Sequence, residues 1–238
     1  MNCPYANRVS ALADILIVYG GVGKIIVFCQ TKNDANALIL SDKIKNDIEV
    51  MHGDIAQNQR EVTMKRFKDG KFKVLVATDV ASRGLDIPNV DLVIQLEPPK
   101  EVETYIHRSG RTARAGMQGT CITFYTTKTK PIIEDIERIA GIKLQRIGIP
   151  QAEDVIRASA KCVLNCLDEV NEQVLSLFED TAVELIEKCG GDPERALKIA
   201  LAFMSGHYKT AIANKSLLTG QEKSFTIRLF NTQNQRLT

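Results

Sequence analysis

Residues Val74 to Asp86 read VLVATDVASRGLD. The stretch begins with four consecutive apolar residues, which is typical of a parallel strand buried on both faces. A polar loop follows directly, and open α/β sheets hold their ligands at the carboxyl ends of parallel strands. Within this loop Thr78 offers a hydroxyl, Gly84 a permissive backbone and Asp86 a carboxylate able to accept sugar hydroxyls. Taken alone, the loop could equally be a turn with an Asx-type bond.

Comparable apolar runs recur along the first 150 residues and alternate with helical patterns. Ile25 to Cys29 reads IIVFC, a continuous apolar run such as a fully covered strand requires. Further strand candidates are 92–94 and 119–125, and helical periodicity marks 9–17, 33–40, 57–67, 102–108 and 132–140. This alternation predicts an α/β domain over residues 1–150, with a parallel sheet and helices on both faces.

After Pro150 the pattern changes to helices. Helical periodicity covers 155–167, 174–188 and 193–204, and Asp192 suits an N-cap. We therefore expect a helical extension over residues 151–218. Residues 224–230 (SFTIRLF) alternate apolar and polar side chains and predict a strand without an obvious partner, so we expect the start of a further, truncated domain at 219–238.

The composition is that of an ordinary globular chain whose overall charge does not identify a partner. Of the 238 residues 44% are hydrophobic and 25% charged, and the net charge is +2, so any nucleic-acid site must be a local patch. Cys162 and Cys166 lie four apart on a predicted helix but lack further ligands for a metal. We expect a reduced protein of the cytosol or nucleus, with no metal site, membrane span or signal peptide.

The segment Gly20 to Lys24 (GGVGK) resembles a phosphate-binding loop only superficially. Such a loop needs GxxxxGK followed by Ser or Thr, between a strand and a helix. Here Ile25 follows the lysine, and the segment leads from a predicted helix into a predicted strand. A glycine-rich helix end explains these residues without a phosphate site.

The strongest functional signal is HRSGRTARAG, residues 107–116. Arg108, Arg111 and Arg114 recur every three residues, separated by small residues that permit close approach of a ligand. Guanidinium groups suit phosphate oxygens and the charge that develops during phosphoryl transfer. A solvated basic face is the alternative interpretation.

A third stretch combines FCQT at 28–31 with HGDIAQNQR at 52–60. Gln57 and Arg60 lie at the start of a predicted helix, where an arginine suits a phosphate backbone. This signal is weak by itself, because Gly53 and its neighbours could form a plain turn before the helix.

In this order and spacing the three stretches resemble the second RecA-like lobe of DEAD-box RNA helicases. HRSGRTARAG resembles motif VI of that family, ATDVASRGLD motif V, IIVFCQT motif IV, and Gln57 with Arg60 the QxxR element. The sequence departs from the family at Ser109, usually a larger apolar residue, and at Ala113, usually glycine. Residues 143–230 are similar, more loosely, to the nucleolar RNA helicase II, or Gu, subfamily, in which a helical extension leads into a small RNA-binding domain.

The resemblance implies the second catalytic lobe of an ATP-dependent RNA helicase. Such an enzyme couples ATP hydrolysis to RNA unwinding or to remodelling of RNA–protein complexes, here in ribosome biogenesis and in the nucleolus, with the cytoplasm as the alternative. Arg111 and Arg114 would act as arginine fingers toward ATP, His107 would link nucleotide state to the partner lobe, and Gly84 and Asp86 would bind ATP. The residues implied to hold RNA are Thr31, Gly53, Gln57, Arg60 and Thr78.

The chain contains neither GxxxxGK[ST] nor the sequence Asp-Glu-Ala-Asp. We therefore expect the phosphate-binding lysine and the Mg²⁺ ligands on an N-terminal RecA-like lobe, and no ATP hydrolysis by this chain alone. Two alternatives stay open. One is a DNA-translocating remodeller, whose arginine motif usually lacks the leading histidine. The other is a non-enzymatic dimerisation or RNA-binding module, in which residues 151–205 would pair two copies of the protein.

Overall fold

The computed structural model describes residues 1–21, 23–44, 47–79, 90–112 and 119–209. These residues form two compact units, one from Met1 to Ile149 and a second that begins at Pro150. Among the helices so described, none is long and apolar enough to cross a membrane. The strand predicted at 224–230, and with it the domain predicted at 219–238, lies outside the described residues.

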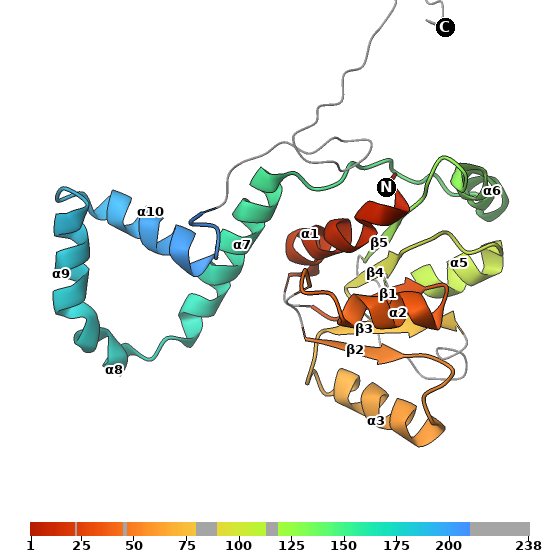
Figure 1. The fold of residues 1–238 in the computed structure, drawn as a ribbon, viewed down its shortest axis with the longest axis horizontal. Helices are drawn as coiled ribbons and strands as arrows, with labels where there is room; N and C mark the ends of the chain where they lie inside the picture. The colour runs from red at the N-terminus through yellow and green to blue at the C-terminus, as the bar shows by residue number, and fades with distance from the viewer. Residues whose placement is uncertain (22, 45–46, 80–89, 113–118, 210–238) are drawn as a thin grey trace, which may run out of the picture. The chain divides into compact units, whose positions relative to one another are not determined.

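The described part of the first unit is built on a five-stranded parallel sheet with the order β2-β3-β1-β4-β5 (Figure 1). The central strands β1 and β3 are buried at every position, as their continuous apolar runs predict. The strands are Ile25–Cys29 (β1), Ile48–Met51 (β2), Val74–Thr78 (β3), Leu92–Gln95 (β4) and Thr120–Thr123 (β5).

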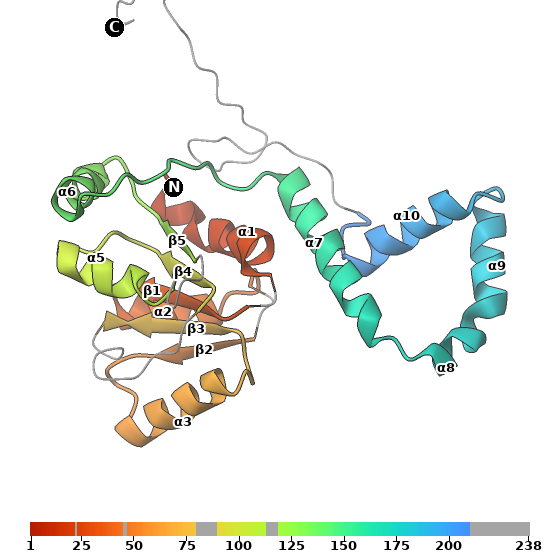
Figure 2. The same cartoon turned by 180° about the vertical axis from the view of Figure 1, so that it is seen from behind.

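Helices cover both faces of this sheet, which confirms the predicted fold class; α1 and α3 lie on opposite sides of it in both views (Figures 1 and 2). Successive strand residues point to opposite faces. The odd-numbered residues of β1 pack with α1 and α2, and the even-numbered ones pack with α3. The helices are Arg8–Gly20 (α1), Lys32–Ile39 (α2), Gln57–Lys68 (α3), Val102–Ser109 (α5) and Lys130–Ala140 (α6).

The GGVGK segment joins a helix to a strand, which is the reverse of the order in a phosphate-binding loop. Helix α1 ends at Gly20, Gly21 follows with a φ of 48°, and β1 begins at Ile25. The N–H of Lys24 donates a hydrogen bond of 2.8 Å to the carboxylate of Asp91, which fixes the entry into β1. The segment is thus a helix end, as the sequence indicates.

Strand β2 was not predicted, because it lies at the edge of the sheet and is only partly buried. Its sequence, IEVM, carries Glu49, which pairs with Arg66 of α3 at 2.5 Å. An edge strand needs no continuous apolar run, since one of its flanks is open to water. A search for continuous apolar runs therefore did not predict strand β2.

The second unit contains helices in its described part, as predicted: Ala152–Cys166 (α7), Glu172–Leu175 (α8), Glu179–Lys188 (α9) and Pro193–Met204 (α10). The side chain of Asp192 accepts hydrogen bonds from two N–H groups of α10, so the predicted cap is confirmed. The prediction of one helix over 174–188 is wrong, because the 3-10 turn Ser176–Phe178 separates α8 from α9. In this turn the hydroxyl of Ser176 bonds to the carbonyl of Gln173 (3.3 Å), a local contact that competes with helix continuation.

Candidate nucleic-acid and nucleotide interface

Three strands of the sheet end together at one edge, and several residues of the predicted RNA site lie at this carboxyl edge. The register pairs Cys29 with Thr78, the last residues of β1 and β3, and the last residue of β2 pairs one position earlier on β3. Thr31 follows β1 by two residues, and Gly53 follows β2 by two residues. The parallel topology therefore brings together Thr31, Gly53 and Thr78, which are far apart in the sequence.

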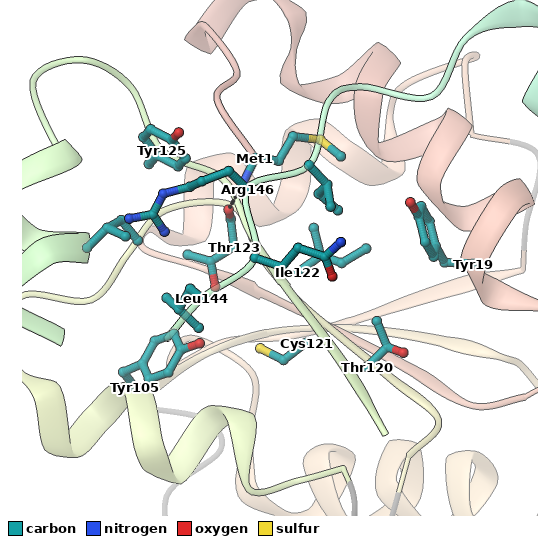
Figure 3. A pocket seen from close by; sticks show the side chains of 13 residues that line it. Met1, Tyr19, Tyr105, Thr120, Cys121, Ile122, Thr123, Tyr125, Leu144 and Arg146 are labelled. Atoms are coloured by element: carbon teal, nitrogen blue, oxygen red, sulfur yellow. Dashed lines mark hydrogen bonds between the residues drawn. The ribbon is translucent and has the colours of Figure 1, made fainter. Parts of the chain in front are cut away.

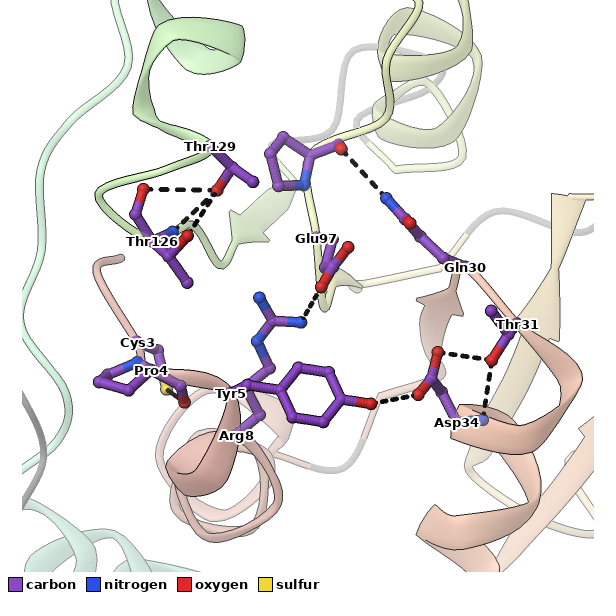
Figure 4. A network of polar contacts seen from close by, with 11 residues as sticks. Cys3, Pro4, Tyr5, Arg8, Gln30, Thr31, Asp34, Glu97, Thr126 and Thr129 are labelled. Atoms are coloured by element: carbon purple, nitrogen blue, oxygen red, sulfur yellow. Dashed lines mark hydrogen bonds and ion pairs between the residues drawn. The ribbon is translucent and has the colours of Figure 1, made fainter.

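The hydroxyl of Thr31 is held in one orientation by Asp34 (Figure 4). It caps α2 by accepting from the N–H of Asp34 (3.1 Å), and it donates to a carboxylate oxygen of the same residue (2.7 Å). The hydroxyl of Tyr5 donates to the other oxygen. Burial opposes the charge of Asp34, but hydrogen bonds from Tyr5 and Thr31 outweigh it and lower the pKa of this carboxyl below its usual value. The network is therefore charged and fully formed at neutral pH.

Gln57 and Arg60 occupy the first turn of α3, as predicted. The amide of Gln57 donates to Glu61 (3.0 Å), and the Nε of Arg60 donates to the carbonyl oxygen of Ile55 (3.0 Å). This bond fixes the guanidinium group of Arg60 beside the residues that precede α3. Helix N-termini favour anions, so the first turn of α3 presents a fixed cation in a suitable electrostatic setting.

Residues 107–112, the part of the 107–116 stretch that the structure describes, lie in the last turn of α5 and directly after it. The side chain of His107 is 68% exposed, and its Nε2 lies 4.0 Å from Glu103. The main chain of Arg111 is fixed on both sides: its N–H donates to the carbonyl of Arg108 (3.2 Å), and its own carbonyl accepts from the N–H of Val90 (3.0 Å). The exposed imidazole of His107 is thus followed, four residues later, by an arginine whose main chain is held by hydrogen bonds.

Arg108 has a role that the sequence pattern did not predict. Its side chain is only 4% exposed and makes a two-pronged ion pair with Asp79, with distances of 2.7 and 2.6 Å. A third nitrogen donates to Gln95 (3.3 Å), and the guanidinium lies 5.2 Å from the centre of the Phe28 ring. The family resemblance assigned no role to Arg108, and in the structure this arginine ties α5 to the end of β3. The only sequence signal was an aspartate directly after Thr78.

Gly84, Asp86 and Arg114 lie outside the described residues. Among the residues that the structure describes, a cavity of about 270 Å³ lies at the carboxyl edge of the sheet. Its walls are Gln30, Asp79, Pro99, Lys100, Glu101, Thr104 and Arg108.

A larger cavity, of about 420 Å³, lies along strand β5 (Figure 3). Tyr105, Cys121, Thr123 and Arg146 contribute to its walls, and none of the predicted site residues does. Burial raises the pKa of the Cys121 thiol, with hydrogen bonds from its neighbours opposing the shift. This cavity therefore shares no wall residue with the predicted interface, and burial favours the protonated form of its thiol.

The described cysteines do not form a metal centre. Burial raises the pKa of the Cys29 thiol, which lies in the core. Cys162 and Cys166 are exposed on α7. Nowhere in the described ranges do three or more His, Cys, Asp or Glu side chains gather as metal ligands do.

Two family models match this chain. The model described as "Helicase conserved C-terminal domain" matches residues 7–116, and the model described as "DDX21/DDX50 dimerisation domain" matches residues 151–204. The first covers most of the sheet and its interface, and the second covers helices α7 to α10. The first unit is therefore a C-terminal, RecA-like helicase domain, and a helical extension follows it.

Comparison with individual proteins identifies the helicase family to which this domain belongs. Nucleolar RNA helicase 2 of Mus musculus is 47% identical over 230 residues, which are 96% of this chain and 27% of that protein. The solved C-terminal domain of the DEAD-box protein Dbp5 is 30% identical, with a TM-score of 0.58, over 65% of this chain and 92% of that chain. S. cerevisiae Dbp5 bound to RNA and ADP BeF3 is also 30% identical, with a TM-score of 0.56, over 61% of this chain and 40% of that chain. The chain belongs to the DEAD-box family, and it spans about a quarter of the length of its mouse relative.

Proposed function

We propose that this chain is the second catalytic lobe of an ATP-dependent RNA helicase, an RNA-stimulated ATPase. The observation that carries the proposal is the shared carboxyl edge. Candidate RNA residues from β1, β2 and β3 converge there, and the ion pair between Arg108 and Asp79 joins that edge to the helix that carries His107. RNA and nucleotide contacts would thus be mechanically linked.

In this proposal Thr31, Gly53, Gln57, Arg60 and Thr78 hold the sugar-phosphate backbone of single-stranded RNA. The anchored guanidinium of Arg60 supports a phosphate contact. The Thr31 hydroxyl donates its proton to Asp34, so it would serve as an acceptor for a ribose hydroxyl. Such contacts position a strand without reading its sequence. The related yeast Dbp5 has been solved bound to RNA and ADP BeF3, which favours the same ligand classes here.

On the nucleotide side, Gly84 and Asp86 would bind ATP, and Arg111 and Arg114 would reach its terminal phosphate. The anchored main chain of Arg111 fits this role, because an arginine finger acts only from a fixed position. Exposed His107 would contact an N-terminal RecA-like lobe of the same protein, which would also supply the Mg²⁺ ligands. Arginine fingers in other phosphoryl-transfer enzymes contribute roughly a thousand-fold or more to turnover.

The test is reconstitution. The purified chain should show no ATPase activity, and mixing it with the N-terminal lobe of the full-length protein should restore RNA-stimulated turnover. Arg111→Ala should abolish that turnover, whereas Arg138→Ala, an exposed arginine of α6, should leave it intact. Clear hydrolysis by the chain alone would contradict the proposal, and stimulation by DNA equal to that by RNA would favour a DNA-translocating enzyme instead.

A second function, dimerisation, is supported by the apolar surface of the helical unit. Few side chains of residues 150–209 are buried, and many large apolar ones are exposed. Helices with so much apolar surface require a partner, and two-fold dimers are the commonest soluble assembly. The exposed set on α7 to α10 and the joining turns is Leu164, Leu167, Val170, Val174, Leu175, Leu177, Phe178, Val183, Leu197, Ile199, Phe203 and Met204.

We place this dimerisation region within a helical extension of residues 151–218, followed by the start of a Gu-type RNA-binding domain at 219–238. The name of the mouse relative, nucleolar RNA helicase 2, supports a nucleolar location, and we extend this to a role in ribosome biogenesis. Imaging of the full-length protein tests the location, and accumulation in the cytoplasm would contradict it.

A further inference from the structure

Tyr5 is an exposed aromatic side chain held rigidly beside the proposed RNA edge. It lies in a short 3-10 turn before α1 (Tyr5–Asn7) and is 64% exposed. Its hydroxyl donates to Asp34, and the guanidinium of Arg8 lies 4.9 Å from the centre of its ring. Arg8 is itself buried and paired with Glu97. The ring is therefore anchored at its tip and supported on one face, while much of its surface is open to solvent (Figure 4).

A hydrogen-bonded chain links this ring to Thr31. Asp34 accepts from Tyr5 through one oxygen and from Thr31 through the other. Thr31 lies two residues beyond β1, at the edge where Gly53 and Thr78 also lie. A strand whose backbone passes Thr31 would thus have an aromatic surface within reach of one of its bases.

The charges around the Tyr5 ring determine whether a phosphate or a base of a nucleic acid can bind next to it. The carboxylates of Asp34 and Glu97 flank the ring, and Arg8 already pairs with Glu97. Lys32, the residue after Thr31, pairs with Asp54 at 2.6 Å. Phosphates are therefore disfavoured near the ring, whereas a base is uncharged on its face and stacks on aromatic side chains.

We propose that Tyr5 is a stacking platform for one nucleobase of single-stranded RNA, next to the backbone contacts of the carboxyl edge. This inference rests on the proposed function, because it requires RNA at that edge. Asp34 and Arg8 act as positioning residues that fix the ring before RNA arrives. A fixed ring loses little conformational freedom on binding, which favours stacking. The contact would not depend strongly on sequence, since every base has a π face.

The first experiment measures binding of the 238-residue chain to single-stranded oligouridine at low ionic strength. Tyr5→Ala should weaken binding roughly 5- to 150-fold, the range expected for one lost base–aromatic stack. Tyr19→Ala, which removes another partly exposed tyrosine, from the far end of α1, should leave the affinity unchanged. A ribose-phosphate oligomer without bases should bind wild type and Tyr5→Ala equally well.

Arg60→Ala separates failure of the inference from failure of the proposed function. A backbone contact predicts that this variant loses affinity for the oligomer with bases and for the oligomer without them. If Arg60→Ala weakens binding and Tyr5→Ala does not, the stacking proposal is overturned and the RNA edge stands. If the wild-type chain binds no RNA, both fail.

The chain contains no tryptophan, which allows a direct optical test. Tyr5→Trp keeps an aromatic face and should still bind oligouridine, and its fluorescence should be quenched as RNA is added. Tyr19→Trp is the matched control and should show no quenching. Unquenched fluorescence of Tyr5→Trp at saturating RNA would overturn the proposal and leave a protein partner as the better explanation for the exposed ring.

Discussion

Replacing Asp79 with alanine tests whether Arg108 depends on a single partner. Two of the three hydrogen bonds from the Arg108 side chain go to Asp79, and the third, to Gln95, is long at 3.3 Å. Asp79→Ala would leave a guanidinium that is 96% buried almost without compensation. Breaking a buried pair in this way costs about 3 to 5 kcal/mol. Because the Asp79 side chain is 35% exposed, water can enter from its side, so we expect the lower end, about 3 kcal/mol.

The assay is urea unfolding of the 238-residue chain, followed by a signal from the sheet domain. Asp135→Ala is the matched control, because Asp135 pairs with Arg138 at 2.6 Å with both side chains exposed, and such pairs contribute less than about 1 kcal/mol. The m-value should stay constant, so that the midpoint shift reports stability. If Asp79→Ala costs no more than Asp135→Ala, the view of Arg108 as a dependent buried charge is refuted.

Three further predictions concern the interface and the helical unit. Arg60→Ala in the full-length protein should weaken binding of all RNA sequences alike and reduce the salt slope by about 0.7; loss confined to one sequence would argue against a phosphate contact. Light scattering should show a dimer for residues 1–238 and a monomer for a chain that ends at Pro150, whereas monomers of both at tens of micromolar would rule out dimerisation through the helices. Asp192→Ala should destabilise the helical unit by about 1 kcal/mol through the lost cap of α10, measurable by thermal melting; Asp168→Ala, at an exposed site that caps no α-helix, should change little.

The sequence alone determined the class of fold and the family. Continuous apolar runs located β1 and β3 because central parallel strands are buried on both faces, and this property is visible in consecutive residues. The stretches 74–86 and 107–116 carried the family resemblance because their residues are contiguous. Helix caps such as Asp192 were predictable for the same reason, since a cap is a local contact.

Only the tertiary structure decided which distant residues meet and which way they face. Edge strand β2 was not predicted, because its burial depends on the neighbouring strand rather than on its own sequence. Arg108 and Arg111 have the same local pattern, yet the packing of α5 against the sheet turns Arg108 inward onto Asp79. Tyr5 likewise shows no sequence signal: its role depends on Asp34, which lies in another helix and reaches it only after the chain has folded. Such contacts are set by strand order and helix packing, which local sequence patterns do not encode.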